Sequence, residues 1–344
     1  MTAAGTLTPP ASAAAPATGE GLRVRGLRVA MGPLPIVHGV DLAVAPGEIL
    51  GLVGESGSGK SVSLRAIPGL LPPKARIAGE VLWNGRNLLA LPPRALQQVR
   101  GREVAMIFQE PGLALNPVMT VGAQIDESLQ AHFPRLGRAA RRERAEQLLA
   151  EVGIPSPRER LGSYPHEFSG GMRQRAMIAI ALAPGPRLLL ADEPTTALDV
   201  TVQDGILRLL RRLVEEHRMA MILVTHDLGV VAETCDRVSV MYAGRVVESG
   251  PAAGLFAHPR HAYTAALLGA MPGEENEGGR LSPVPGTPPS PLRMPPGCAF
   301  APRCTWRMAG CEAGVPALES VEPDHLAACL AADLLPPRWM EQDR

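Results

Sequence analysis

The chain of 344 residues contains very little lysine and few aromatic residues. Lys60 and Lys74 are its two lysines, so a lysine inside a motif carries more weight here than in an average sequence. Aromatic residues make up 3% of the chain, which argues against a stacking platform for single-stranded nucleic acid. The 34 basic residues are balanced by 34 acidic ones, whereas nucleic-acid binders usually carry excess positive charge. We therefore expect no nucleic acid among its partners.

Long hydrophobic runs are also missing. The nearest candidate, Ala176 to Ala191, is interrupted by Pro184, Pro186 and Arg187, so no segment has the roughly 20 apolar residues that a transmembrane helix needs. Residues 1–20 are rich in alanine, proline and threonine and hold no lysine or arginine, unlike a signal or transit peptide. We expect a disordered tail there. We also expect a reducing compartment, in which the five cysteines do not form stable disulfides.

Short apolar runs are present, and they indicate an α/β fold. Ile49–Val53, Leu188–Ala191 and Met221–Val224 have the composition of strands that are buried on both faces, as in a parallel sheet. Apolar residues with helical spacing follow from Val202. Because strand and helix alternate, we expect a doubly wound core.

A different pattern begins at Pro111 and indicates a helical insert in this core. Leu129–Val152 is predicted to form a helix with a solvated, arginine-rich stretch. Residues 273–296 are rich in proline, glycine and glutamate and predict a linker. Beyond this linker lies a tail that carries four of the five cysteines.

A phosphate-binding pattern follows the first strand. The segment from Gly54 to Ser61 matches G-x-x-x-x-G-K-[ST] and precedes a helix-like stretch. Its glycines allow the backbone to curl, so that successive N–H groups point at phosphate oxygens. Lys60 can reach the β- and γ-phosphates, and the Ser61 hydroxyl can ligate Mg²⁺. A plain glycine-rich turn is the alternative. We expect nucleotide phosphates and Mg²⁺ to bind at Gly54, Glu55, Ser56, Gly57, Ser58, Gly59, Lys60 and Ser61.

Two carboxylates follow the second apolar strand. Asp192 ends this strand and Glu193 comes next. Asp192 can hold Mg²⁺ directly or through water. Glu193 is placed to orient and deprotonate a water that attacks the γ-phosphate. A solvated strand end, or a pair of acids that caps the next helix, is the alternative.

A Ser-Gly-Gly motif precedes these carboxylates. The stretch from Ser169 to Gln174 reads Ser-Gly-Gly-Met-Arg-Gln. Together with Lys60 and Asp192 it resembles the signature of ATP-binding cassette (ABC) ATPases, and the resemblance extends over roughly residues 22–330.

Three further positions fit the same order. Gln109 is similar to the Q-loop glutamine of the family, Asp199 to the D-loop aspartate and His226 to the switch histidine. Each has an ordinary alternative, such as polar surface, a helix cap or a histidine at a strand end. Their joint order favours the family.

The resemblance implies a definite architecture. We expect an α/β fold: a P-loop NTPase (RecA-like) core with an antiparallel β edge, an inserted α-helical subdomain and a small Cys-containing C-terminal extension. The ABC ATPase domain would span residues 21–272, with the helical subdomain at about 111–178. The linker would span 273–296 and the extension 297–344.

The resemblance also implies a mechanism. Two cassettes face head to tail and sandwich two ATP molecules, each bound to one phosphate loop and covered by signature residues of the partner. The residues implied are Glu193, His226 and Gln109 for catalysis, Ser61, Gln109 and Asp192 for Mg²⁺, and Ser169, Gly170, Gly171 and Asp199 for nucleotide contact.

The family usually stacks adenine on an aromatic residue that precedes the phosphate loop. The corresponding residue here is Met31, and no Phe, Tyr or Trp occurs before Trp83. A thioether packs on a purine less specifically than an aromatic ring does. The preference for ATP over GTP is therefore open.

Several stretches are similar to ATPase subunits of oligopeptide/dipeptide permeases, among them Met106–Pro117, Tyr164–Ser169 and His261–Thr264. This resemblance implies that an extracytoplasmic solute-binding protein delivers short peptides to two transmembrane permease subunits, which take them up. The ATPase would lie peripherally on the cytoplasmic face of the inner membrane, paired with a second related ATPase or with its own copy. The alternatives are another solute, such as nickel, or a nucleotide-gated regulatory module with little turnover.

The C-terminal tail carries Cys298, Cys304, Cys311 and Cys329. Four thiols in a reducing compartment suggest a metal or cluster site, although the closely spaced pairs typical of zinc are missing. Four unrelated cysteines are the alternative. The tail is similar to the peptide-permease extension, in which four cysteines can hold a [4Fe–4S] cluster. We expect a structural cluster here, with zinc as second choice and His325 as a substitute zinc ligand.

Overall fold

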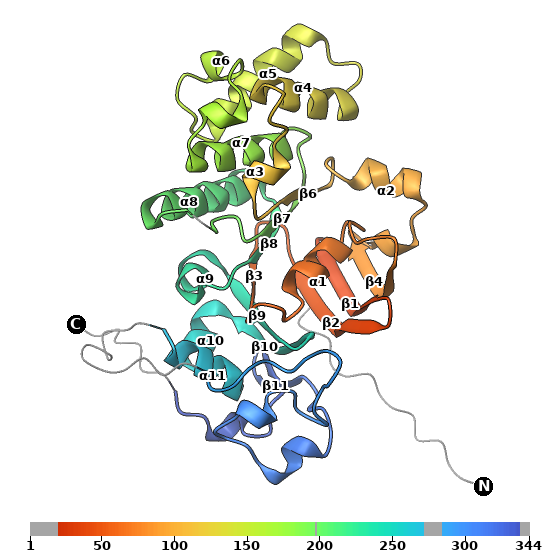
Figure 1. Ribbon diagram of the computed structural model, residues 1–344, viewed down its shortest axis with the longest axis vertical. Coiled ribbons are helices and arrows are strands. Elements are labelled where there is room, and N and C mark those ends of the chain that lie inside the picture. Colours follow the sequence, from red (N-terminus) through yellow and green to blue (C-terminus); the bar gives the residue numbers. More distant parts are fainter. Residues whose placement is uncertain (1–19, 197, 272–283, 338–344) are drawn as a thin grey trace.

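The computed structural model describes residues 20–196, 198–271 and 284–337. The predicted disordered tail lies outside these residues except for Glu20, as does part of the predicted linker. The helices α3 to α7 form one end of an elongated molecule and the C-terminal extension forms the other, with strands β1, β2 and β4 beside the middle (Figure 1).

An eight-stranded sheet runs through the molecule in the order β11-β12-β10-β9-β3-β8-β7-β6. The strands β9, β3, β8, β7 and β6 run parallel to one another, while β10 pairs antiparallel with β9 and β12, and β11 pairs antiparallel with β12. The three strands predicted from apolar runs are confirmed. The bounds are β3 Ile49–Val53, β6 Val104–Ile107, β7 Leu188–Asp192, β8 Ala220–Val224, β9 Arg237–Tyr242, β10 Arg245–Pro251, β11 Glu319–Glu322 and β12 His325–Ala327.

Both faces of the parallel strands are covered, which explains their uninterrupted apolar sequences. Along β7, Leu188 and Leu190 join a core that includes Leu64, whereas Leu189 and Ala191 join the core on the opposite face. Successive side chains of a strand point to opposite faces, so each face of the sheet needs its own apolar residues.

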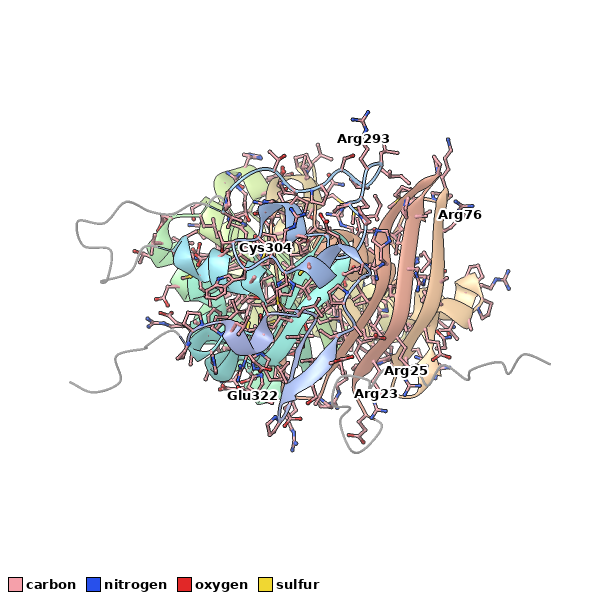
Figure 2. The ribbon with its side chains drawn as sticks, turned by 90° about the horizontal axis from the view of Figure 1, so that it is seen from below. Arg23, Arg25, Arg76, Arg293, Cys304 and Glu322 are labelled. Carbon is pink, nitrogen blue, oxygen red and sulfur yellow. The ribbon has the colours of Figure 1, made fainter. Side chains whose placement is uncertain are left out.

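A second, antiparallel sheet has the order β2-β1-β4-β5. Its strands β1, β2 and β4 lie side by side along one flank when the molecule is seen from below, with Arg25 on β1 and Arg76 on β4 (Figure 2). The expected antiparallel β edge is thus present. The bounds are β1 Leu22–Met31, β2 Leu34–Val44, β4 Ala75–Trp83 and β5 Arg86–Asn87, and the helices beside the sheets are α1 Lys60–Ala66 and α2 Pro93–Val99.

The segment after β6 is mainly helical, but the helix predicted over Leu129–Val152 is wrong. The structure places two helices there, with a break between His132 and Arg138. Pro134 lies in the break and disfavours helical backbone at the residue before it. The bounds are α3 Pro111–Ala114, α4 Val121–His132, α5 Arg138–Glu151, α6 Pro157–Arg160, α7 Gly170–Leu182 and α8 Val200–His217.

Three further helices lead to the C-terminal extension: α9 Leu228–Thr234, α10 Ala252–Ala257 and α11 Ala262–Gly269. In the part of the chain that the structure describes, none of the helices combines the length and the apolar character needed to cross a membrane.

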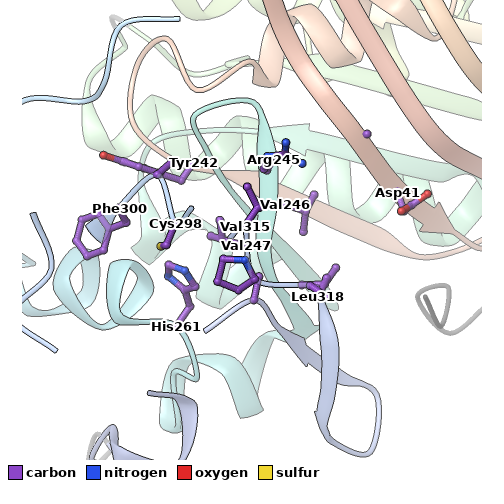
Figure 3. Close-up of a pocket in the computed structure, with 15 residues that line it drawn as sticks. Asp41, Tyr242, Arg245, Val246, Val247, His261, Cys298, Phe300, Val315 and Leu318 are labelled. Carbon is purple, nitrogen blue, oxygen red and sulfur yellow. The ribbon is translucent and has the colours of Figure 1, made fainter. Parts of the chain in front are cut away.

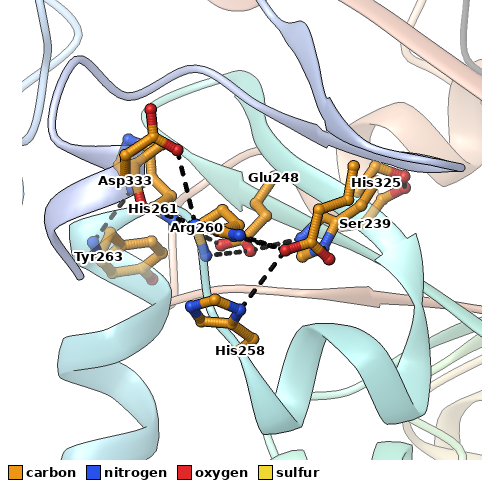
Figure 4. A network of polar contacts seen from close by, with 11 residues as sticks. Ser239, Glu248, His258, Arg260, His261, Tyr263, His325 and Asp333 are labelled. Atoms are coloured by element: carbon orange, nitrogen blue, oxygen red, sulfur yellow. Dashed lines mark hydrogen bonds and ion pairs between the residues drawn. The ribbon is translucent and has the colours of Figure 1, made fainter. Parts of the chain in front are cut away.

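Buried polar contacts fasten the extension to the α/β core (Figure 4). The fully buried Glu248 of β10 accepts hydrogen bonds from the N–H groups of Arg260 and His261, at 2.6 and 3.0 Å. Its carboxylate also lies 2.8 Å from Nε2 of His325 on β12. Arg260 in turn bonds Glu322 on β11. Because a buried carboxylate needs partners, these contacts fix the extension against β10.

Candidate nucleotide site

The phosphate loop joins β3 to α1 and depends on glycine. Gly54, Gly57 and Gly59 have φ values of 144°, 78° and 99°. A Cβ atom at Gly54 would lie 2.1 Å from the carbonyl oxygen of Met241, so a side chain there would force the loop off β9. The loop therefore has the curled backbone that the sequence predicted.

Lys60 folds back across this loop. Its Nζ donates to the carbonyl oxygens of Gly54 and Glu55, at 2.7 and 2.9 Å. Burial lowers the pKa of Lys60, while the carboxylates of Glu193, Asp192 and Glu55 act in the opposite direction. The ammonium group therefore lies inside the loop, close to several acids, where a polyphosphate could replace its carbonyl partners.

Asp192 ends β7 beside the start of α1. The Ser61 hydroxyl donates to its Oδ1 at 2.7 Å, and Arg65 Nη2 lies 3.0 Å from its Oδ2. The aspartate is fully buried. Oxygen ligands suit Mg²⁺, and Ser61 and Asp192, two of the three side chains that the sequence assigned to the metal, lie together here.

Glu193 is held in an unusual backbone conformation. Its φ is 48°, in the left-handed region that non-glycine residues seldom occupy, and its N–H donates to the Val224 carbonyl at 3.0 Å. Such conformations persist where the surrounding structure fixes them, often at functional sites. The link to the end of β8 fixes the direction in which the Glu193 side chain leaves the strand.

The other predicted catalytic side chains meet at the Glu193 carboxylate. Gln109 Nε2 lies 3.2 Å from Oε2, the Thr196 hydroxyl donates to the same oxygen at 2.8 Å, and His226 Nδ1 lies 3.4 Å from it. Gln109 follows β6 and His226 follows β8. Three neighbouring strand ends thus bring these groups to one edge of the sheet, where ligands of α/β folds commonly bind.

A cavity of about 980 Å³ lies over these groups. Its polar lining consists of loop and strand-end residues, and its apolar lining includes a segment of the predicted linker. The lining residues are Ile36, Ser56, Gly57, Gly59, Lys60, Ser61, Val62, Gln109, Glu193, Thr196, His226, Pro288, Pro289 and Pro291. Met31, at the end of β1, is not among the described residues that line it; its side chain packs against the core below the second sheet.

The signature residues lie apart from this cavity, at the start of α7. The Ser169 hydroxyl accepts from the Met172 N–H at 3.3 Å and caps the helix. A Cβ at Gly171 would come within 2.6 Å of Val202, so glycine allows α7 to approach α8 closely. Asp199 caps α8 in the same way, accepting from the Val202 N–H at 3.0 Å. Within one chain, the structure does not bring these residues to Lys60.

One contact to the phosphate loop was missed by sequence reasoning. Arg303 of the extension makes a paired contact with the Glu55 carboxylate, at 2.8 and 2.9 Å. The Glu55 N–H also donates to the Tyr263 hydroxyl at 2.8 Å. No local pattern connects Glu55 with an arginine 248 residues later in the chain, so the sequence held no signal for this pair.

The four tail cysteines gather where the extension packs on the core. The Cys298 N–H donates to the Cys311 carbonyl at 2.8 Å, and Cys298, Cys304 and Cys329 pack against the same apolar core. Burial raises the pKa of each of these three thiols, and the charge of neighbouring cysteines adds to the effect. The described residues include no group of three or more His, Cys, Asp or Glu side chains arranged to hold a metal ion.

A second cavity, of about 290 Å³, separates part of the extension from β10 (Figure 3). Cys298, His261 and Phe300 line it. Burial lowers the pKa of His261 to about 4, so this imidazole is neutral at physiological pH. His325, the expected substitute ligand for zinc, is buried, and its Nε2 lies 2.8 Å from the Glu248 carboxylate.

Comparison with known proteins agrees with this geometry. Residues 37–196 match the ABC transporter family, and residues 247–311 match the C-terminal region of oligopeptide/dipeptide transporters. Among solved structures, the chain resembles the dimeric post-hydrolysis state of the ATP-binding cassette MJ0796 bound to ADP and Pi. That similarity has a TM-score of 0.60 at 29% identity and covers 67% of this chain and 98% of that one.

Two curated relatives match along most of their length. A probable peptide ABC transporter ATP-binding protein, y4tR of Sinorhizobium fredii, is 52% identical over 295 residues, which cover 85% of this chain and 88% of that protein. The oligopeptide transport ATP-binding protein OppD of Salmonella typhimurium is 48% identical over 312 residues, or 90% and 92% of the two chains. The chain therefore belongs to the ATP-binding proteins of oligopeptide/dipeptide-type ABC transporters.

Proposed function

We propose that this chain binds and hydrolyses ATP to power the uptake of di- and oligopeptides through two separate transmembrane permease subunits. The observation that carries the proposal is the meeting of Gln109, Thr196 and His226 at Glu193, over the cavity that Lys60 lines. The relatives named for peptide transport support the cargo class.

The proposed reaction uses the groups around the cavity. Backbone N–H groups of the loop and the Lys60 ammonium bind the β- and γ-phosphates. Ser61, Asp192 and Gln109 would hold Mg²⁺, which would neutralise phosphate charge. The Glu193 carboxylate accepts a proton from the attacking water. At the same time the water oxygen forms a bond to the γ-phosphorus, and the bond between that phosphorus and ADP breaks. His226 and Thr196 position that carboxylate through Oε2.

We propose that the signature residues act on the nucleotide of a partner cassette. Ser169 begins a helix of 13 residues and lies outside the cavity of its own chain. The free N–H groups at a helix start attract anions, so Ser169, Gly170 and Gly171 of one copy suit the γ-phosphate bound by another. The second cassette is a related ATPase or an identical copy. Asp199 would lie at the contact between the two cassettes. The pair works on the cytoplasmic face of the inner membrane, fed indirectly by an extracytoplasmic solute-binding protein.

Transport into liposomes tests the proposal. The chain, reconstituted with its permease subunits and binding protein, should drive ATP-dependent uptake of a labelled tripeptide. Uptake of Ni²⁺ without peptide would favour a nickel importer. Binding of ATP with no steady-state phosphate release would favour the regulatory module.

For the extension, we propose that Cys298, Cys304, Cys311 and Cys329 hold a structural [4Fe–4S] cluster, with zinc as second choice. The raised pKa of the Cys298, Cys304 and Cys329 thiols, due first to burial and then to neighbouring cysteines, supports this, because bound metal would compensate the charge of thiolates placed near one another. The cluster would cross-link the extension.

Metal analysis provides the test for the cysteine site. Protein purified anaerobically should contain about four iron and four sulfide per chain, the composition of a [4Fe–4S] cluster. The Cys304→Ala variant should lose most of this iron, whereas Cys235→Ala, a change in the cysteine outside the tail, should keep it. One zinc per chain with no iron would overturn the cluster.

A further inference from the structure

The nucleotide cavity has apolar walls that the proposed chemistry leaves unused. Its polar residues surround the phosphates, the metal and the attacking water. What remains includes Ile36 on β2 and the segment Pro288–Pro291, which lies in the predicted linker before the C-terminal extension. A triphosphate alone would fill little of about 980 Å³, and these walls offer no charge to a phosphate.

Ile36 is fixed beside the phosphate loop. A Cβ atom at Gly59 would lie 3.4 Å from the Ile36 carbonyl oxygen, so β2 passes next to the last glycine of the loop. The Ile36 side chain is half-buried and lines the cavity. A nucleotide whose phosphates occupy the loop would therefore have an apolar surface within reach.

The proline segment is held in place by Arg303. Its Nε donates to the Pro285 carbonyl at 2.6 Å, while the same guanidinium contacts both oxygens of Glu55 in the phosphate loop. The Arg303 side chain is 5% exposed and lies over the Tyr242 ring. A single buried cation thus joins the phosphate loop to the backbone just before Pro288, with the rigid geometry of a paired arginine–carboxylate contact.

We infer that the base of the bound nucleotide packs between Ile36 and Pro288–Pro291, so that the linker before the extension supplies a wall of the nucleotide site. Arg303 acts as a positioning residue for that wall. The inference rests on the proposed function, since it takes the ligand to be ATP. Proline rings are apolar and already rigid, so they can cover a flat base with little loss of conformational entropy. In this arrangement the base does not need an aromatic residue at the position that Met31 occupies.

The test compares two probes that share phosphates and differ in the base. A non-hydrolysable β,γ-imido analogue of ATP and inorganic tripolyphosphate are titrated, both with Mg²⁺, into the full chain. The double variant Pro288→Ala/Pro289→Ala should bind the ATP analogue about tenfold more weakly, a loss of roughly 1.4 kcal/mol. Its affinity for tripolyphosphate should stay within about twofold of the wild type.

The chain offers a matched control. Pro295 and Pro296 form a second Pro-Pro pair in the same segment and do not line the cavity among the described residues. Pro295→Ala/Pro296→Ala should leave both affinities within about twofold of the wild type. Ile36→Ala approaches the base from the other wall and should show the same selective loss as Pro288→Ala/Pro289→Ala, which keeps the test decisive if that double variant unfolds.

Two results would overturn the inference: equal weakening of both probes by the Pro288/Pro289 and Ile36 variants, or unchanged affinity for the ATP analogue in both. Failure of the proposed function looks different. In that case the wild-type chain itself would bind neither probe.

Discussion

The Glu193→Gln variant is expected to hydrolyse ATP about a thousandfold more slowly than the wild type, while it binds ATP with nearly unchanged affinity. The amide has the shape of the carboxylate and can still accept from Thr196, but it cannot take a proton from water. Steady-state phosphate release and a binding titration with ATP measure the two effects. Because hydrolysis is what separates the proposed cassette pair, the variant should also accumulate as an ATP-bound dimer.

Glu233→Gln gives the control for this prediction. Glu233 is exposed on α9, so the same chemical change there should leave turnover intact. If Glu193→Gln retained half of the wild-type turnover, another group would have to be the base. His226, which lies 3.4 Å from the Glu193 carboxylate, would then be the first to examine.

The second large effect is expected at Lys60. Lys60→Ala should weaken ATP binding about a hundredfold, because charge-assisted hydrogen bonds to phosphate contribute about 1.5–3 kcal/mol. In the structure the ammonium group bonds Gly54 and Glu55, so nucleotide would exchange two carbonyl partners for phosphate oxygens. Isothermal titration with ATP and Mg²⁺ measures the loss.

The other lysine of the chain serves as control for this change. Lys74 is exposed and immediately precedes β4. The Lys74→Ala variant should therefore bind ATP as the wild type does. Lys60→Ala and Glu193→Gln should also differ in kind, since the first loses binding and the second keeps it. Unchanged ATP affinity in Lys60→Ala would place the triphosphate elsewhere on the chain.

The parts of the site that the sequence predicted are those with local causes. Five consecutive apolar residues identify β3, and the glycines after it are needed for the turn that the structure shows at Gly54. Asp192 and Glu193 follow β7 directly, so the direction of the strand places them. Such features depend on neighbours in the chain, and a single sequence contains them.

The parts that the sequence did not predict depend on contacts between distant segments. Arg303 finds Glu55 across most of the chain, and Pro288–Pro291 lines the cavity close to the Pro285 carbonyl that Arg303 bonds. The break between α4 and α5 is different, because Pro134 is a local signal that interrupts the helical periodicity on either side of it.

The pairing of β12 with β10 has a consequence for how this protein can be shortened. Glu248 and Ser249 on β10 face Ala327 and Leu326 on β12, so the last part of the chain closes one margin of the central sheet. Cutting the polypeptide before Cys298 would uncover backbone donors and acceptors on β10 and strip Glu248 of His325. Exposed edge strands readily pair with one another through backbone hydrogen bonds. An ATPase core produced without its tail would therefore tend to associate through β10, and such aggregates would say nothing about nucleotide-driven dimers.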